Sequence, residues 1–504
     1  MGGVCSYWTV VVPTKSPAEA MAEQWLFVLP MGNNFFARLD CIRFHRMCLC
    51  LACCLVQFCS GSIYSFTLVS DDLDAFFSGA KSKQCMQALL LGYICLGATA
   101  ALSGPFLERK GPRVGMAIGT IMVGLGHILA QAGVARKDLR WLIVAYGVAV
   151  GIGFGLLLIT SLSTVQKWFP DLRGSITGLS VVSFGVGNAV FIKVFAVYVA
   201  RNEIHKLFWV TGMTFVNYLA VQSQLEGTDG HYFQQVKALS LLQCIFSTDF
   251  VCMYVAFAAS IMPIVVFIPQ AQSLQDLFHV DNMTFMFYTY LANLSGRLVA
   301  TVASDVLIRV WYANPAFARK MVFVALLALE CVALVALPQF NVDLLTRQWL
   351  SNALTFASGG GLALMPCFVT DMFGVYNSGS MYGLIWTSWS LGAAIAWHFL
   401  PGTTLTIDSY EVQLHWMLVL AATALGLMLF VRTNSSDRFF CGYQLTACNK
   451  VLVQVPFGRQ HATNEDVLDS MSFTTHTPRS VDANADGFVL WSGEGYGAKH
   501  IRHV

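Results

Sequence analysis

A permanent positive charge lies inside a hydrophobic segment of the chain. The segment Tyr290–Asp305 reads YLANLSGRLVATVASD, with Arg297 at its centre. A guanidinium in the middle of a membrane helix costs about 2.5–3.5 kcal/mol on insertion scales, so a function or a partner must offset it. Arginine grips a carboxylate through two parallel hydrogen bonds. We therefore interpret Arg297 as the candidate group for binding an anion, with Asn293, one helical turn earlier, placed to orient the same anion.

A fixed counter-ion is the alternative to a mobile anion. Glu330 lies about 15 Å into its own span from Arg319, and Arg297 lies about 12 Å from Asp305, at 1.5 Å per residue. The two charges therefore have similar depths, and charges inside a membrane usually pair. Glu330 stays open as a charge partner of Arg297 or as a proton site.

Four residues at similar depths complete the candidate pocket. Their depths suit a site near the membrane midplane, whereas the sequence does not fix the direction that each side chain faces. They are Gln57, Tyr64, Tyr93 and Trp386.

The composition is that of a membrane protein. The chain has 504 residues, of which 56% are hydrophobic and 12% charged, against about 25% charged residues in soluble domains. The net charge of +2 gives no reason to expect a nucleic-acid partner. No HExxH, GxSxG or P-loop pattern is present. We therefore expect a protein of the lipid bilayer that is not an enzyme and needs neither a cofactor nor a metal.

Hydrophobic runs predict an all-α membrane protein with twelve transmembrane helices. Their even number puts both tails on one side, and the distribution of Arg and Lys favours the cytoplasm. We expect a tail at 1–45, a six-helix half at 46–223, a cytoplasmic loop at 224–248, a second half at 249–431 and a disordered tail at 432–504. The predicted spans are 46–70, 84–107, 113–133, 140–163, 174–197, 205–223, 249–270, 282–305, 319–338, 347–370, 378–400 and 412–431.

The two predicted halves are related in sequence. The fourth span ends in GFGLLLITSLSTVQKWFPDLRGSITG, and the tenth in SGGGLALMPCFVTDMFGVYNSGSMYG. Aligning Phe169 with Phe373 also aligns Gly155 with Gly359. Related six-span halves are typical of a carrier that arose by duplication.

Charged residues follow the second span in the sequence GPFLERKGPR. Glu108, Arg109 and Arg113 with their glycines resemble the signature loop of the major facilitator superfamily. We expect a cytoplasmic gate in which Glu108 pairs with Arg173 or with the start of the eleventh span. Asp305, in the related sequence TVASDVLIR, is the corresponding residue of the second half.

The junction KWFPDLRGSITGLSVVSFGVG resembles that of the oxalate:formate antiporter family, which is kin to the monocarboxylate transporters; nodulin-like carriers share part of the pattern. The resemblance implies a carrier of small carboxylates whose arginine in span eight, here Arg297, contacts the anion. Oxalate carriers add a lysine in span eleven, which is absent between Ser378 and Leu400. Monocarboxylate transporters carry a proton-coupling aspartate where this chain has Asn293.

These patterns predict a secondary active or facilitative carrier of a small organic anion, with a monocarboxylate such as pyruvate or lactate favoured. Protons or a counter-anion are the candidate coupling partners, and the plasma membrane is favoured over an organelle membrane. Two alternatives stay open: a carrier of another solute, such as a nodulin-like metal or amino-acid carrier, and a transporter-like receptor. The N-terminal MGGVCS also fits a myristoylation pattern, with Gly2 as the acceptor.

Overall fold

The fold of the chain was analysed in a computed structural model. The described residues are 25–32, 35–43, 45–78, 84–200, 208, 244–267, 270, 274, 282–339, 344–374, 378–399, 406–433, 442–447 and 450–456. Within them, 10 helices are long and apolar enough to cross a membrane. The prediction of an all-α membrane protein is confirmed. The sixth predicted span, 205–223, lies outside the described residues except for Phe208.

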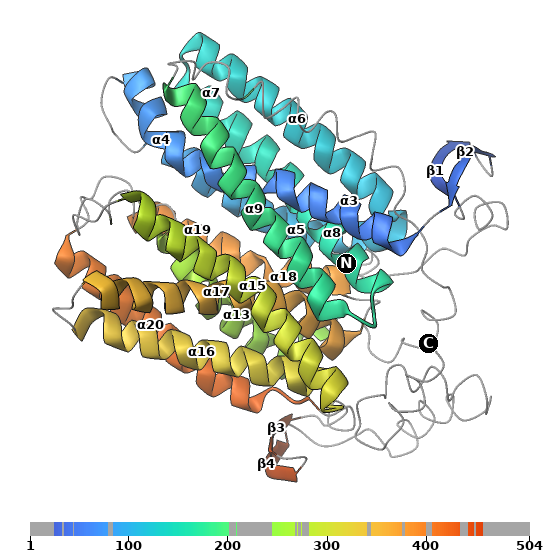
Figure 1. Cartoon of the computed structure of the whole chain (residues 1–504), viewed down its shortest axis with the longest axis vertical. Coiled ribbons are helices and arrows are strands. Elements are labelled where there is room, and N and C mark those ends of the chain that lie inside the picture. Colours follow the sequence, from blue (N-terminus) through green and yellow to red (C-terminus); the bar gives the residue numbers. More distant parts are fainter. Residues whose placement is uncertain are drawn as a thin grey trace.

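The first group of helices forms the upper bundle in Figure 1, coloured blue to green. The fourth predicted span contains one π-helical turn, η1, between two α-helical segments. The elements are α3 (Arg46–Ser60), α4 (Ser62–Ser78), α5 (Met86–Lys110), α6 (Pro112–Arg136), α7 (Leu139–Val144), η1 (Ala145–Val150), α8 (Gly151–Trp168) and α9 (Arg173–Ala200).

The second group forms the lower bundle, coloured yellow to orange (Figure 1). Together the two groups account for eleven of the twelve predicted spans. The elements are α13 (Thr248–Phe267), α15 (Asn282–Val310), α16 (Pro315–Gln339), α17 (Leu344–Phe373), α18 (Ser378–Ile385), α19 (Thr387–Phe399) and α20 (Ile407–Phe430).

Helices of the two bundles make extensive contact along two seams. Helix α9 packs along α15, and α5 packs along both α18 and α19. Small residues permit the close approach: a Cβ added at Gly104 of α5 would lie 2.5 Å from the Cα of Ser380 in α18. These two seams flank the region between the bundles.

The eleventh predicted span is broken at Trp386, between α18 and α19. The backbone N–H of Trp386 donates to two backbone oxygens at once, that of Tyr382 at 3.2 Å and that of Gly383 at 3.1 Å. The backbone at this turn stays hydrogen-bonded, since the oxygen of Trp386 accepts from the N–H groups of Trp389 and Ser390 at 3.0 and 3.4 Å.

Both tails contain paired strands that the sequence analysis did not predict. Strands β1 (Trp25–Gly32) and β2 (Phe35–Arg43) pair antiparallel before α3. Strands β3 (Gly442–Ala447) and β4 (Lys450–Pro456) pair after α20, within a tail expected to be disordered. Alternating β-branched residues such as Val451, Val453 and Val455 favour the strand there. Both pairs lie at the same end of the bundles (Figure 1).

A buried ion pair fixes the start of the C-terminal tail. The backbone N–H and Nη2 of Arg432 each donate to a carboxylate oxygen of Asp249 at 2.8 Å, which ties the end of α20 to the start of α13. Lys320 of α16 donates to the carbonyl oxygens of Leu429 and Val431 at 3.1 and 2.8 Å. These contacts satisfy the C-terminal carbonyls of α20, which an unpaired helix end would leave exposed to lipid.

Candidate functional site

Arg297 lies on α15 at the seam with α9, and only 3% of its surface is exposed. Its Nε donates to Oδ1 of Asn293 at 3.0 Å, and its Nη1 donates to the backbone oxygen of Val181 in α9 at 2.9 Å. Gly185 leaves room for the guanidinium, because a Cβ there would lie 3.3 Å from Nη1. The cation is therefore held in one orientation between the two bundles.

No acidic side chain neutralises Arg297 within the part of the chain that the structure describes. The ion pairs found there join other residues. Among the same residues, Nη2 of Arg297 has no hydrogen-bond partner. Among the described residues, the guanidinium therefore has no acidic partner and retains an N–H group without an acceptor.

The predicted pair between Glu330 and Arg297 does not form. Glu330 lies on α16, 1% exposed, and neither of its carboxylate oxygens has a hydrogen-bond partner among the described residues. The guanidinium of Arg297 instead points towards α9. A similar distance along their helices therefore does not bring the two side chains into contact.

We expect Glu330→Leu to stabilise the protein. A buried carboxyl group without a partner carries a desolvation penalty of about 1–3 kcal/mol, and leucine fills a similar volume without that penalty. Thermal unfolding of the purified protein in detergent should therefore shift to higher temperature. A lower melting temperature would show that Glu330 has a stabilising partner.

A cavity of about 30 Å³ lies between the bundles beside Arg297. Five predicted site residues line it together: Arg297, Gln57, Tyr64, Tyr93 and Trp386. Asn293 does not line the cavity; it lies behind Arg297 and donates from Nδ2 to the backbone oxygen of Thr355 at 2.9 Å. Asn293 therefore positions the guanidinium, where the sequence suggested direct contact with the anion.

Aromatic rings from both bundles form much of the cavity wall. Tyr64 of α4 stacks on Trp389 of α19, with ring centroids 6.2 Å apart and planes 18° from parallel. Tyr93 of α5 meets Trp389 edge-on at 5.7 Å. Trp389 was not among the predicted pocket residues, although Trp386 of the same span was. Its position three residues after Trp386, on the same face of a helix, could have suggested it.

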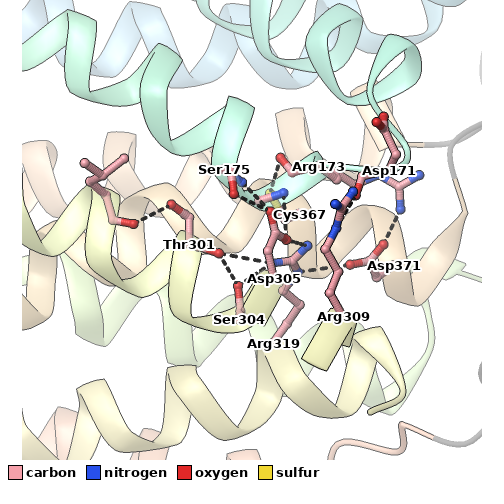
Figure 2. Close-up of polar contacts among 12 residues, drawn as sticks. Asp171, Arg173, Ser175, Thr301, Ser304, Asp305, Arg309, Arg319, Cys367 and Asp371 are labelled. Atoms are coloured by element: carbon pink, nitrogen blue, oxygen red, sulfur yellow. Dashed lines mark hydrogen bonds and ion pairs between the residues drawn. The ribbon is translucent and has the colours of Figure 1, made fainter. Parts of the chain in front are cut away.

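The gate cluster lies at one end of the seam between α9 and α15, and we define it by Arg173, Asp305, Arg319 and Asp371 (Figure 2). Asp305 accepts hydrogen bonds from the backbone N–H groups of Gly174 and Ser175, at 3.1 and 2.6 Å, at the start of α9. A carboxylate at a helix N-terminus meets unpaired N–H groups and the positive end of the helix dipole. Asp305 thereby joins the second bundle to the first.

Two arginines extend this cluster across the seam. Arg319 of α16 contacts Asp305 at 2.7 Å and Asp371 at 3.2 Å, while Arg173 of α9 pairs with the other oxygen of Asp371. Asp371 was not predicted as a gate residue. In the alignment of Phe169 with Phe373, Asp371 corresponds to Lys167. The two related halves therefore carry opposite charges at this position.

Glu108 forms a second charged contact, on the seam between α5 and α18. Its predicted pairing with Arg173 is wrong, because Arg173 pairs with Asp371. Glu108 pairs with Lys167 of its own bundle. Its other oxygen lies beside Gly379 at the start of α18, since a Cβ there would be 2.8 Å from Oε1. The alternative expectation, a contact with the start of the eleventh span, agrees with this geometry.

Two other predicted gate residues lie near Glu108. Arg109 follows it in the last turn of α5 and is half-buried. Arg113 lies in the first turn of α6, and its Nε is buried without a hydrogen-bond partner among the described residues. Their roles in a gate stay predictions.

We expect Glu108→Gln to weaken the charge-assisted contact with Lys167 by about 1–2 kcal/mol and so to release the side chain that packs against the start of α18. Hydrogen exchange at the first turn of α18 should then increase several-fold. Exchange at the first turn of α9, which Asp305 holds, serves as the internal control and should stay unchanged. If the first turn of α18 exchanged at the same rate in the variant as in the wild type, Glu108 would not form a gate contact.

Comparison with known proteins agrees with this architecture. The family model described as Major Facilitator Superfamily matches residues 48–397. An uncharacterized MFS-type transporter of Escherichia coli, YhjX, is 27% identical over 67% of this chain and 83% of its own length. The oxalate:formate antiporter of Oxalobacter formigenes is 23% identical over 72% of this chain and 87% of its own. The proton:xylose symporter XylE has a similar fold, with a TM-score of 0.60 at 15% identity, over 77% of this chain and 97% of that one.

Proposed function

Because the chain belongs to the major facilitator superfamily, we propose that it is a secondary active or facilitative carrier of a small organic anion, by alternating access. The substrate class that we favour is a monocarboxylate. The observation that carries this proposal is Arg297: a buried cation, held by Asn293 and Val181, that lines a cavity between the bundles and has no acidic partner in the described structure.

The charge of the cavity lining supports an anion with one carboxylate. Arg297 is the single charged residue among the described residues that line it. A metal cation would meet no carboxylate there, and the ammonium group of an amino acid would meet none either. A second carboxylate would be buried without a cation, which is costly in a medium of low dielectric constant. The missing lysine in the eleventh span has the same implication.

The size of the cavity supports a small substrate. A buried water needs roughly 10–15 Å³ of such volume, so a cavity of about 30 Å³ has room for only a few atoms. A larger solute would have to separate the stacked rings of Tyr64 and Trp389, which belong to different bundles.

The two seams support alternating access. The gate cluster links helices of the two bundles at one end, and the carboxylate of Glu108 packs against the start of α18. Opening this end would break those contacts, so their stability relative to the opposite end sets the balance between the two access states. Arg297 lies about 12 Å from Asp305 along α15, at 1.5 Å per residue, close enough for binding and gating to share one helix.

Uptake into proteoliposomes tests the proposal. The purified full chain is assayed with labelled pyruvate, lactate, oxalate, leucine and ferrous iron, against protein-free liposomes. We expect saturable uptake of pyruvate or lactate, and little uptake of oxalate. Uptake of leucine or iron alone would indicate a carrier of another solute, and uptake of none of these compounds would favour a transporter-like receptor. Localisation of the tagged chain in its own cells tests the plasma membrane, which we favour.

A further inference from the structure

Helices α9 and α15 stay in contact beyond Arg297, towards the end of the bundles away from the gate cluster (Figure 1). A Cβ added at Gly178 would contact Thr301, and one added at Gly185 would contact Leu294. Seven residues forward on α9 thus correspond to seven residues back on α15. The two helices therefore run antiparallel in one register, and this register identifies the residues that face each other on the next turn.

Asn188 of α9 and Tyr290 of α15 occupy that next turn of the seam. Asn188 lies three residues after Gly185, and Tyr290 lies four residues before Leu294, spacings that keep each residue on the same face of its helix. Tyr290 is two helical turns from Arg297, about 10.5 Å along α15, in the direction away from the gate cluster. Arg297 therefore lies between the gate cluster and the Asn188–Tyr290 pair.

Polar contacts join this pair to each other and to the cavity. The side-chain amide of Asn188 interacts with the hydroxyl of Tyr290 across the seam. Oγ of Ser65 in α4 donates to Oδ1 of Asn188 at 2.9 Å, so the amide oxygen already accepts and the NH2 group is the one that can donate to Tyr290. Tyr290 also interacts electrostatically with Tyr64 and Tyr93, which line the cavity. The pair therefore links the two bundles beside the cavity.

The two ends of this seam are held by contacts of different strength. At the gate cluster, the carboxylate of Asp305 accepts from two backbone N–H groups and pairs with Arg319. At the other end, neither Asn188 nor Tyr290 carries a charge. Charge-assisted hydrogen bonds are roughly twice as strong as neutral ones, so separating the helices at the Asn188–Tyr290 pair costs less than separating them at the gate cluster.

We propose that Asn188 and Tyr290 form a second gate, which closes the cavity at the end opposite the gate cluster and opens more readily than that cluster. This inference rests on the proposed function, because alternating access requires the two ends to open in turn. The empty carrier then favours the state that is open beside Tyr290, and substrate reaches Arg297 from that side. Asn188 and Tyr290 act on opening, while Arg297 meets the charge of the substrate.

Labelling of a cavity residue tests the second gate without any substrate. Val181 lines the cavity, so Val181→Cys provides a thiol there, and mass spectrometry of its peptide follows the rate at which a maleimide reacts in nanodiscs. Tyr290→Phe should raise this rate about fivefold, the factor that one neutral hydrogen bond contributes. Tyr288→Phe is the matched control, since Tyr288 is 49% exposed on the same helix, and it should leave the rate unchanged. An unchanged rate in Tyr290→Phe, or an equal increase in both variants, would overturn the second gate.

A reversible crosslink tests whether this pair must separate during transport. Asn188→Cys and Tyr290→Cys are combined, and the reconstituted full chain is treated with a short bifunctional thiol reagent that a reductant cleaves. The two single variants, treated in the same way, control for the native cysteines. Crosslinking should stop uptake of labelled pyruvate in the double variant alone, and the reductant should restore it. Uptake that continues in the crosslinked protein would contradict the gate. If the wild type takes up no carboxylate, the proposed function fails, and the labelling rates still decide whether Asn188 and Tyr290 form a gate.

Discussion

Replacing Arg297 by glutamine is expected to remove nearly all carboxylate uptake while the protein still folds and inserts. Glutamine keeps a polar head but no charge, so a carboxylate entering the cavity would lose its cation in a medium of low dielectric constant. Truncating one member of a buried charge pair costs about 3–5 kcal/mol, which corresponds to a loss of about a hundred-fold to a few thousand-fold in affinity. Insertion should improve, because an unpaired arginine at mid-helix is unfavourable.

Arg297→Lys separates charge from geometry. Lysine keeps the positive charge but loses the planar fork and the fixed contacts that Nε and Nη1 make with Asn293 and Val181. Uptake should therefore fall strongly, and KM should change more than the maximal rate of uptake. Arg136→Gln is the matched control, since Arg136 is exposed at the end of α6, far from the cavity lining. Wild-type rate and affinity in Arg297→Gln would contradict the anion site.

Asp305→Asn is expected to loosen the gate cluster more than any other single change described here. The carboxylate of Asp305 accepts from two backbone N–H groups and the hydroxyl of Ser175, and it also pairs with Arg319. Asparagine cannot reproduce four charge-assisted contacts, and it leaves Asp371 as the one acidic partner of Arg319 among the described residues. Breaking a buried ion pair costs about 3–5 kcal/mol, so conformations open at this end should become at least a hundred-fold more populated.

Hydrogen exchange at the start of α9 measures this opening. The amides of Gly174 and Ser175 lose their carboxylate acceptor when the seam opens, so their exchange should accelerate in Asp305→Asn reconstituted in nanodiscs. Asp138→Asn is the control, because Asp138 caps α7 and has no contact with the gate cluster among its hydrogen bonds. Wild-type exchange at residues 173–178 in Asp305→Asn would show that this carboxylate does not hold the seam.

Sequence reasoning was most informative for residues whose placement in an apolar span costs the most free energy. Arg297 was identifiable because a cation in an apolar span needs an explanation, and Asn293 because helical spacing brings residues four apart together. Gln57, Tyr64 and Tyr93 could be proposed from depth alone, and the structure places all three in the cavity lining. The helices were predictable because a bilayer requires long apolar runs.

Predictions that depend on helix rotation were less successful. Depth gave Glu330 as a partner for Arg297, but depth does not determine which face of a helix a side chain occupies. Glu108 was assigned to Arg173 by charge, whereas packing places Lys167 beside Glu108 and Asp371 beside Arg173. Helix α18 packs closely on α5, where a Cβ at Gly383 would clash with the backbone of Ala100. None of these arrangements is encoded in local periodicity.

Equilibrium binding tests the anion site most directly, because it does not depend on gating or on turnover. Binding of labelled pyruvate to the purified wild-type protein is measured by scintillation proximity, with unlabelled acetate, lactate and oxalate as competitors. We expect one saturable site per chain, displaced by the monocarboxylates and abolished in Arg297→Gln, with full binding retained in Arg136→Gln. Saturable pyruvate binding of wild-type affinity in Arg297→Gln would show that the anion binds elsewhere, and the proposed site would be wrong.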